Sequence, residues 1–262
     1  MRLLEIKSPG EFSLIHADTP DTYPYAILSH TWTDGQEVSY HDLVTGTGKS
    51  KAGYDKIKFC GKQATKDALK YFWIDTCCID KSDLDELTTT INSMFRWYQK
   101  AKKCYVYLAD VATIGSDAHV EAQQMSWEAA FRKSRWFTRG WTLQELIAPA
   151  TVEFFWKEGK LLGSKASLEK LIQEITRIPI QALQGNPFSD FSIAERIKWS
   201  SQRQTTREED IVYCLLGLCE VSMPAIYGEG KELALKRLEM TIKGFSKDGG
   251  ALKDLQGTLY ST

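Results

Sequence analysis

Residues 139–145 (Arg-Gly-Trp-Thr-Leu-Gln-Glu) combine a guanidinium, an indole and a carboxylate in one short segment. On a helix, Trp141 and Glu145 are four residues apart and share a face, so the indole can wall a pocket and stack on a ligand ring beside the carboxylate. Arg139 can either bind a pyrophosphate through its planar fork of donors or orient Glu145. Carboxylates are seldom buried without a partner, so a carboxylate in this aromatic segment needs a specific reason to be there. We take Glu145 as the candidate catalytic residue. The alternative is a structural ion pair between Glu145 and Arg139.

Polar and aromatic residues also follow two apolar runs that are expected to be strands. Each of them can line a ligand pocket, but each also has a purely structural role available, such as stabilising a tight loop or ending a strand. We take the following as ligand-binding candidates together with Arg139 and Trp141: Ser29, His30, Trp32, Asp75 and Asp80.

The elements that must position these residues alternate along the first part of the chain. Apolar runs predict strands at 25–29, 71–79, 104–108 and 151–156, and helical periodicity predicts helices from residue 54, over 87–101 and over most of 127–147. This alternation favours an α/β fold with a mainly parallel sheet flanked by helices, because parallel neighbours need long crossover connections. Ligands bind beyond the carboxyl ends of such strands, so the loops after Ser29, Asp75 and Leu108 should meet there with the helix that carries Glu145.

The pattern changes to helices beyond Gly159, with helices expected at 168–176, 192–201, 208–218 and 232–245. We therefore divide the chain into an α/β core at 1–160, a helical extension packed on it at 161–248, and a tail or linker at 249–262.

Composition narrows the functional classes. With 33 Lys and Arg against 34 Asp and Glu, the net charge of −1 argues against a dedicated nucleic-acid binder. No apolar run approaches the roughly 20 residues of a membrane span, and no secretory signal is evident, so a cytoplasmic location is expected. The six cysteines lack paired spacing and the four histidines are scattered, so we expect no metal site. The sequence also lacks four common motifs: the phosphate-binding loop, the nucleophile elbow of esterases, the dinucleotide-binding glycine motif and the zinc-protease motif.

Three segments in order resemble the signature blocks of the fungal heterokaryon-incompatibility (HET) domain. They are Tyr25-Ala-Ile-Leu-Ser-His-Thr-Trp32, Trp73-Ile-Asp-Thr-Cys-Cys-Ile-Asp80 and Arg139-Gly-Trp-Thr-Leu-Gln-Glu145. The later segment at 203–230 resembles the region that follows these blocks in many such proteins, so the resemblance covers nearly the whole chain. One departure is Lys81, which stands where Gln is commoner.

The resemblance implies a role in the cell death that follows fusion of genetically different fungal cells. HET domains have been likened to TIR domains, which implies a flavodoxin-like fold, and Trp141-x-x-x-Glu145 looks like the Trp-x-x-x-Glu element of TIR enzymes that cleave NAD. Glu145 would then be the catalytic carboxylate and NAD or a related nucleotide the substrate, with no further cofactor. Cleavage of the bond between nicotinamide and ribose builds oxocarbenium-like charge, which a fixed carboxylate can stabilise.

An alternative from another class is a non-enzymatic TIR-like module that triggers death through homotypic or partner contacts. In either case the resemblance implies a homo-oligomer in the active state, and related domains are often fused to nucleotide-binding and repeat modules. The sequence does not separate NAD from NADP, or hydrolysis from cyclisation.

Overall fold

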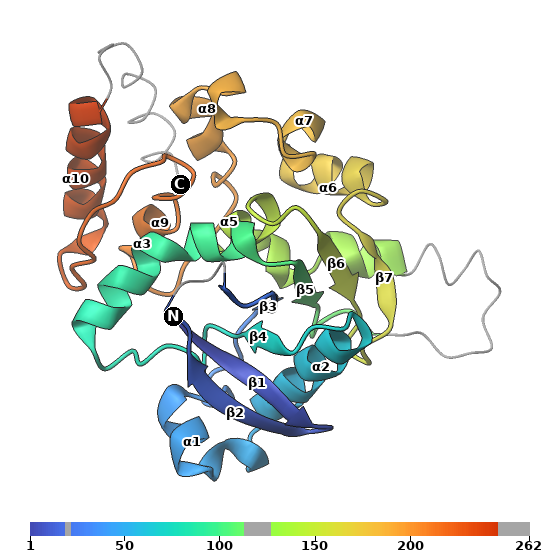
Figure 1. The fold of residues 1–262 in the computed structure, drawn as a ribbon. Helices are drawn as coiled ribbons and strands as arrows, with labels where there is room; N and C mark the ends of the chain where they lie inside the picture. The colour runs from blue at the N-terminus through green and yellow to red at the C-terminus, as the bar shows by residue number, and fades with distance from the viewer. Residues whose placement is uncertain (19–21, 113–126, 246–262) are drawn as a thin grey trace.

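Seven strands form one mixed sheet in the order β2-β1-β4-β3-β5-β6-β7 in the computed structural model, which describes residues 1–18, 22–112 and 127–245 (Figure 1). The predicted tail at 249–262 lies outside the described residues. The strands are β1 (Arg2–Ser8), β2 (Glu11–His16), β3 (Tyr25–His30), β4 (Tyr71–Trp73), β5 (Lys103–Tyr107), β6 (Val152–Phe155) and β7 (Leu161–Ser164).

The four central strands are parallel and the strands at both edges are antiparallel. β4, β3, β5 and β6 pair in parallel, whereas β1 pairs antiparallel with both β2 and β4, and β7 pairs antiparallel with β6. Numbered by chain order, the parallel strands run 2-1-3-4, which is the flavodoxin-like order. This confirms the predicted α/β class with its parallel core, while β1, β2 and β7 are additions that the sequence did not predict.

The order of connections changes direction between β3 and β5. The chain leaves β3 for its neighbour β4 on one side and then returns past β3 to pair β5 on the other. Ligands in open α/β sheets bind beyond the carboxyl ends of the strands at such a switch point. The carboxyl end of β3, at Ser29 and His30, lies there.

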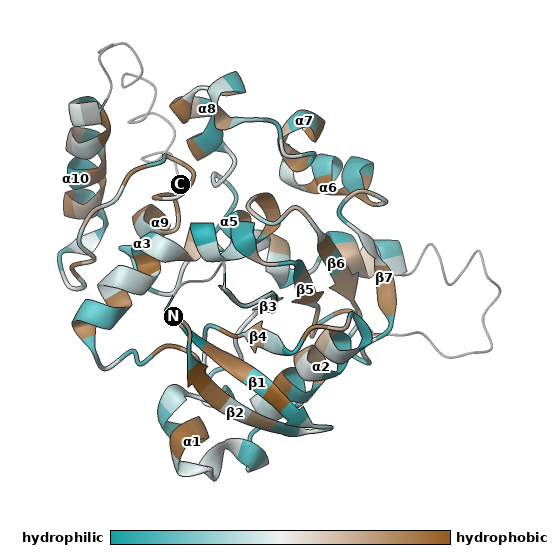
Figure 2. Ribbon diagram, viewed as in Figure 1, coloured by the Kyte–Doolittle hydropathy of each residue, from teal (hydrophilic) through white to brown (hydrophobic). Residues whose placement is uncertain are grey.

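Helices cover both faces of the central strands, so β3 is buried along its whole length. Side chains alternate between the faces of a strand. Tyr25 and Ser29 face α3 (Leu84–Lys100) and α5 (Thr142–Ile147), and His30 faces the side of α2 (Gly53–Lys66). Figure 2 shows the resulting core as brown, apolar strands β5 and β6.

α2 and α3 form where helical periodicity predicts them. Asp83 caps α3 by accepting from the backbone N–H groups of Asp85 and Glu86, at 3.0 Å each. The segment at 127–147 is helical over most of its length, as predicted, but it is not one continuous helix. The 3₁₀ helix η3 (Arg135–Thr138) interrupts it, and α5 is its last part. Asp110 accepts from the Ser134 hydroxyl and the Arg135 N–H, which holds the break in place.

The remaining helices are short apart from α10. They are α1 (Tyr40–Thr45), η2 (Thr47–Ser50), α6 (Glu169–Thr176), α7 (Ile180–Leu183), η4 (Phe188–Asp190), α8 (Ile193–Lys198), α9 (Asp210–Tyr213) and α10 (Gly230–Phe245). Within the part of the chain that the structure describes, no helix is long and apolar enough to cross a membrane. Because β7 pairs with β6, the sheet continues past residue 160.

Candidate functional site

Glu145 lies inside the protein, against the end of β3. Only 4% of its surface is exposed. The Ser29 hydroxyl donates to the Glu145 carboxylate, and the Trp136 indole N–H donates to the Ser29 Oγ at 2.7 Å. Tyr98 on α3 is hydrogen-bonded to the same carboxylate and donates to the Leu28 carbonyl at 3.0 Å. Four elements thus fix one carboxyl group at the switch point of the sheet.

This environment raises the pKa of Glu145 to about 8. Burial is the main cause, because removing a carboxylate from water disfavours its charged form, and the charge of Asp75 adds to the shift. The contacts of Glu145 with Ser29 and Tyr98 and the charge of Arg203 act in the opposite direction but are weaker. At neutral pH the Glu145 carboxyl therefore carries a proton in this conformation.

The helix that carries Glu145 is held at its C-terminal end by a buried lysine. Lys165 Nζ donates to the carbonyls of Leu146 and Pro149, at 3.2 and 2.8 Å. Burial lowers the pKa of Lys165 to about 8. A donor at this end satisfies carbonyls that have no partner within the helix.

The start of the same helix is joined to the helical extension. Arg203 is buried and donates to the Arg139 carbonyl and the Thr142 hydroxyl, at 2.8 Å each. Burial lowers the pKa of Arg203 to about 10. The Arg139 guanidinium points to the extension and donates to the Thr206 hydroxyl at 3.1 Å, and no ion pair joins Arg139 to Glu145 among the described residues. Arg139 therefore fastens the extension to the core.

A second polar group lies beyond the same end of the sheet. The buried His30 ring stands between two carboxylates, with Nε2 3.4 Å from Glu37 and Nδ1 3.9 Å from Asp75. Asp75 accepts from the Trp32 indole N–H at 3.0 Å. Lys56 on α2 donates to Glu37 and to the Thr31 carbonyl. The loops after β3 and β4 therefore meet as the strand order requires.

Ser29 and His30 were both expected to line one ligand pocket, but they point to opposite faces of the sheet. Ser29 joins Glu145, and His30 joins Glu37 and Asp75. The two polar groups interact electrostatically, because the negative charge of Asp75 in the His30 group raises the pKa of Glu145 in the other.

Asp80 and Trp141 take other positions. The Asp80 carboxylate accepts from the Ser82 hydroxyl and N–H and stabilises a turn, and these bonds hold its pKa below the ordinary value. Trp141 is half-buried and hydrogen-bonded to Asp210 in the extension, while Glu145 one turn later is buried. Among the described residues, no hydrogen bond joins Asp80 or Trp141 to the Glu145 carboxyl.

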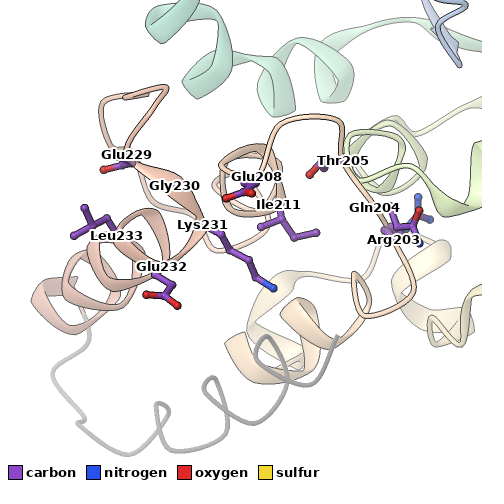
Figure 3. A pocket seen from close by; sticks show the side chains of 10 residues that line it. All are labelled: Arg203, Gln204, Thr205, Glu208, Ile211, Glu229, Gly230, Lys231, Glu232 and Leu233. Carbon is purple, nitrogen blue, oxygen red and sulfur yellow. The ribbon is translucent and has the colours of Figure 1, made fainter.

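A pocket of about 760 Å³ lies within the extension rather than at Glu145 (Figure 3). Arg203 and Gln204 stand across it from Lys231 and Glu232 at the start of α10. Its charged residues are of both signs, and neither Ser29 nor Glu145 is among the residues that line it. Among the described residues, no cluster of three or more His, Cys, Asp or Glu is arranged to hold a metal ion.

A family model described as heterokaryon incompatibility protein (HET) matches residues 25–124. The chain is also similar to vegetative incompatibility protein HET-E-1 of Podospora anserina, with 55% identity over 261 residues and 98% of this chain covered. The chain belongs to the heterokaryon-incompatibility (HET) family. It spans 19% of the length of that relative, and no solved structure matches it. The family resemblance seen in the sequence is thus confirmed.

Some side chains that hold Glu145 or its helix in place were not predicted from the sequence. Tyr98 occupies an apolar position of the α3 periodicity, which explains its burial but gives no signal of its hydroxyl contacts. Arg203 lies about 60 residues beyond the helix it holds. Trp136 is fully buried, as is common for an apolar core residue, but its indole N–H also supports Ser29.

Proposed function

We propose that this HET domain is a cell-death effector that cleaves the bond between nicotinamide and ribose in NAD, with Glu145 as the carboxylate that acts on the ribose. The observation that carries the proposal is the fixed carboxyl of Glu145, whose pKa is about 8, at the switch point of a flavodoxin-like sheet. Strongly perturbed carboxyl groups at such places are typical of reaction centres. The Trp-x-x-x-Glu likeness to NAD-cleaving TIR enzymes supports the same assignment.

The proposed reaction is a hydrolysis. A water oxygen forms a bond to the anomeric carbon of the ribose while the bond to the nicotinamide nitrogen breaks, and the bonding electrons neutralise the pyridinium. ADP-ribose and nicotinamide are the products, and the proton of the attacking water passes to the ionised Glu145 carboxylate or to solvent. The ionised carboxylate also stabilises the positive charge that develops on the sugar.

This role requires Glu145 to become accessible, because only 4% of its surface is exposed in the single chain. We propose that assembly of several copies opens the contacts of Ser29 and Trp136 around it. The chain covers about a fifth of its curated relative, which supports fusion of this domain to further modules that control such assembly.

The first prediction concerns NAD cleavage. Purified protein at high concentration should release nicotinamide from NAD, and Glu145→Gln should reduce the rate at least tenfold, because the amide can neither ionise nor take up a proton. Chromatography of nicotinamide and ADP-ribose measures the reaction.

Glu174→Gln is the matched control, because Glu174 is exposed and pairs only with Arg132 in the described chain. It should cleave NAD at the wild-type rate. No nicotinamide release from assembled wild-type protein, or equal release by Glu145→Gln, would falsify the proposal.

The burial of Glu145 also favours a second candidate, the non-enzymatic assembly module. If it is correct, killing on expression in a fungus should survive Glu145→Gln and be lost when exposed lysines of α10 are reversed, as in Lys236→Glu with Lys243→Glu. These residues are seven apart and lie on one exposed helix face. Colony viability after induction measures the effect. Loss of killing in Glu145→Gln with normal killing in the α10 variant would exclude this candidate.

A further inference from the structure

Trp32 is unusually accessible for so large an aromatic residue. It exposes 46% of its surface, whereas Trp side chains are highly buried on average. It follows β3 at the carboxyl edge of the parallel strands, beside the switch point. An exposed aromatic ring at this edge is positioned to meet a ligand.

The indole is also held in a fixed orientation. Its N–H donates to Asp75 Oδ2 at 3.0 Å, and the ammonium of Lys81 lies over the ring at 3.8 Å from its centroid. Lys81 covers one side of the ring, and the exposed remainder is available to another planar group. A ring that is already ordered loses little conformational entropy on stacking.

Lys81 has an ammonium without a salt bridge in the described part of the chain. Three carboxylates influence it electrostatically, but each has another partner: Asp75 binds Trp32, Glu37 binds Lys56, and Asp210 binds Tyr227. Lys81 is exposed as a residue, but its ammonium is packed against the indole, where burial lowers the pKa of Lys81. Within the described chain, no carboxylate of its own competes with an anion for this ammonium.

We propose that Trp32 and Lys81 form the subsite for the adenine and phosphate end of a nucleotide, with Asp75 as the positioning residue that orients the indole. This inference rests on the proposed function, because it assigns a place to part of the same substrate. A base stacks on the indole and a phosphate oxygen approaches the ammonium. The positively charged pyridinium of NAD is repelled by Lys81, so the adenine half occupies this subsite.

Binding of ADP-ribose and of adenosine to the purified protein, measured by isothermal titration calorimetry, tests the subsite. Trp32→Leu should weaken both ligands by about tenfold, since both need the stacking surface. Lys81→Gln should weaken ADP-ribose by about fivefold and leave adenosine unchanged, since only the former has phosphates. Both positions are exposed, so thermal unfolding should show that both variants are folded.

Lys58→Gln is the matched control, because Lys58 also lies over an aromatic ring, that of Tyr54 at 5.7 Å, but it pairs with the exposed Asp55 and not with Trp32 or Asp75. It should leave both affinities unchanged. Absence of ADP-ribose binding to the wild type, or unchanged affinity in Trp32→Leu, would overturn the subsite.

The test separates this inference from the proposed function. Glu145→Gln should bind adenosine as tightly as the wild type, because adenosine lacks the ribose on which Glu145 is proposed to act. Binding that depends on Trp32, without any cleavage of NAD, would support the subsite and contradict only the cleavage proposal. Cleavage of NAD with wild-type affinity in Trp32→Leu would contradict only the subsite.

Discussion

Glu145→Gln should make the HET domain more stable than the wild type at neutral pH, by roughly 3 kcal/mol at pH 7. The folded wild type holds a protonated carboxyl whose pKa is about 8, whereas in the unfolded chain the same group ionises near its ordinary value of 4.5. Folding at pH 7 must therefore take up a proton. Glutamine resembles the protonated carboxyl and avoids this cost.

The pH dependence of the effect follows from the direction of the shift. Below about pH 4.5 both states of the wild type are protonated, so the carboxyl costs nothing. Between 4.5 and 8 only the unfolded state ionises, and each pH unit lowers the free energy of unfolding by about 1.4 kcal/mol relative to the glutamine variant. Above 8 both states are ionised and the difference stays constant.

Glutamine also preserves the local hydrogen bonds. Its carbonyl can accept from the Ser29 hydroxyl, and its amide can donate to Tyr98, whose own hydroxyl donates to the Leu28 carbonyl. Glu145→Ala is the control, because it leaves a cavity and an unpaired Ser29 hydroxyl and should be about 3 kcal/mol less stable than Glu145→Gln. Urea unfolding at pH 5, 7 and 8.5 measures both variants. A stability gain that does not grow with pH would show that Glu145 is ionised in the folded protein.

This prediction strengthens the functional test. A variant that loses activity while gaining stability has lost chemistry rather than fold. The same result would indicate that the wild type retains a carboxyl at a cost to its stability, which is typical of functional sites. Glu145 is thus a residue at which stability and activity should respond in opposite directions.

The parallel core was predictable because its strands are buried on both faces and read as short apolar runs, as Tyr25–His30 shows. The edge strands gave no such signal. β2 is only partly buried, and β7 begins with the exposed Leu161. The break within the helical segment at 127–147 depends on the distant Asp110, which local periodicity does not reveal.

The candidate site was predictable in its location but not in its contacts. The order of parallel strands brings the ends of β3 and β4 together, so the meeting of Trp32 and Asp75 follows from topology. The separation of Ser29 from His30 follows from the two-residue repeat of a strand, which places neighbouring side chains on opposite faces of the sheet. The link from Arg203 to the start of α5 depends on tertiary packing of the extension, which no short motif encodes.

Gly217→Ala should cost about 3 kcal/mol of stability, because this glycine of the extension leaves no room for a Cβ atom against α3 of the core. A Cβ atom at Gly217 would lie 2.2 Å from the Phe95 Cβ on α3. The Phe95 Cβ is bonded directly to the helix backbone and cannot rotate away. The extension or α3 must therefore move, and α3 also carries Tyr98, which binds Glu145.

The prediction can be checked by a double-mutant cycle in urea unfolding. Phe95→Gly removes the opposing Cβ, so Gly217→Ala should cost at least 1 kcal/mol less in that background, within the range typical of contacting residues (about 0.5–3 kcal/mol). Gly244→Ala is the matched control, since no atom lies within 4 Å of its added Cβ, and on α10 it should be neutral or stabilising by up to about 1 kcal/mol. Equal costs of Gly217→Ala in both backgrounds would show that the extension does not pack on α3 at this point. A coupled cost would instead establish that the extension packs on α3, the helix that also carries Tyr98, a hydrogen-bond partner of Glu145.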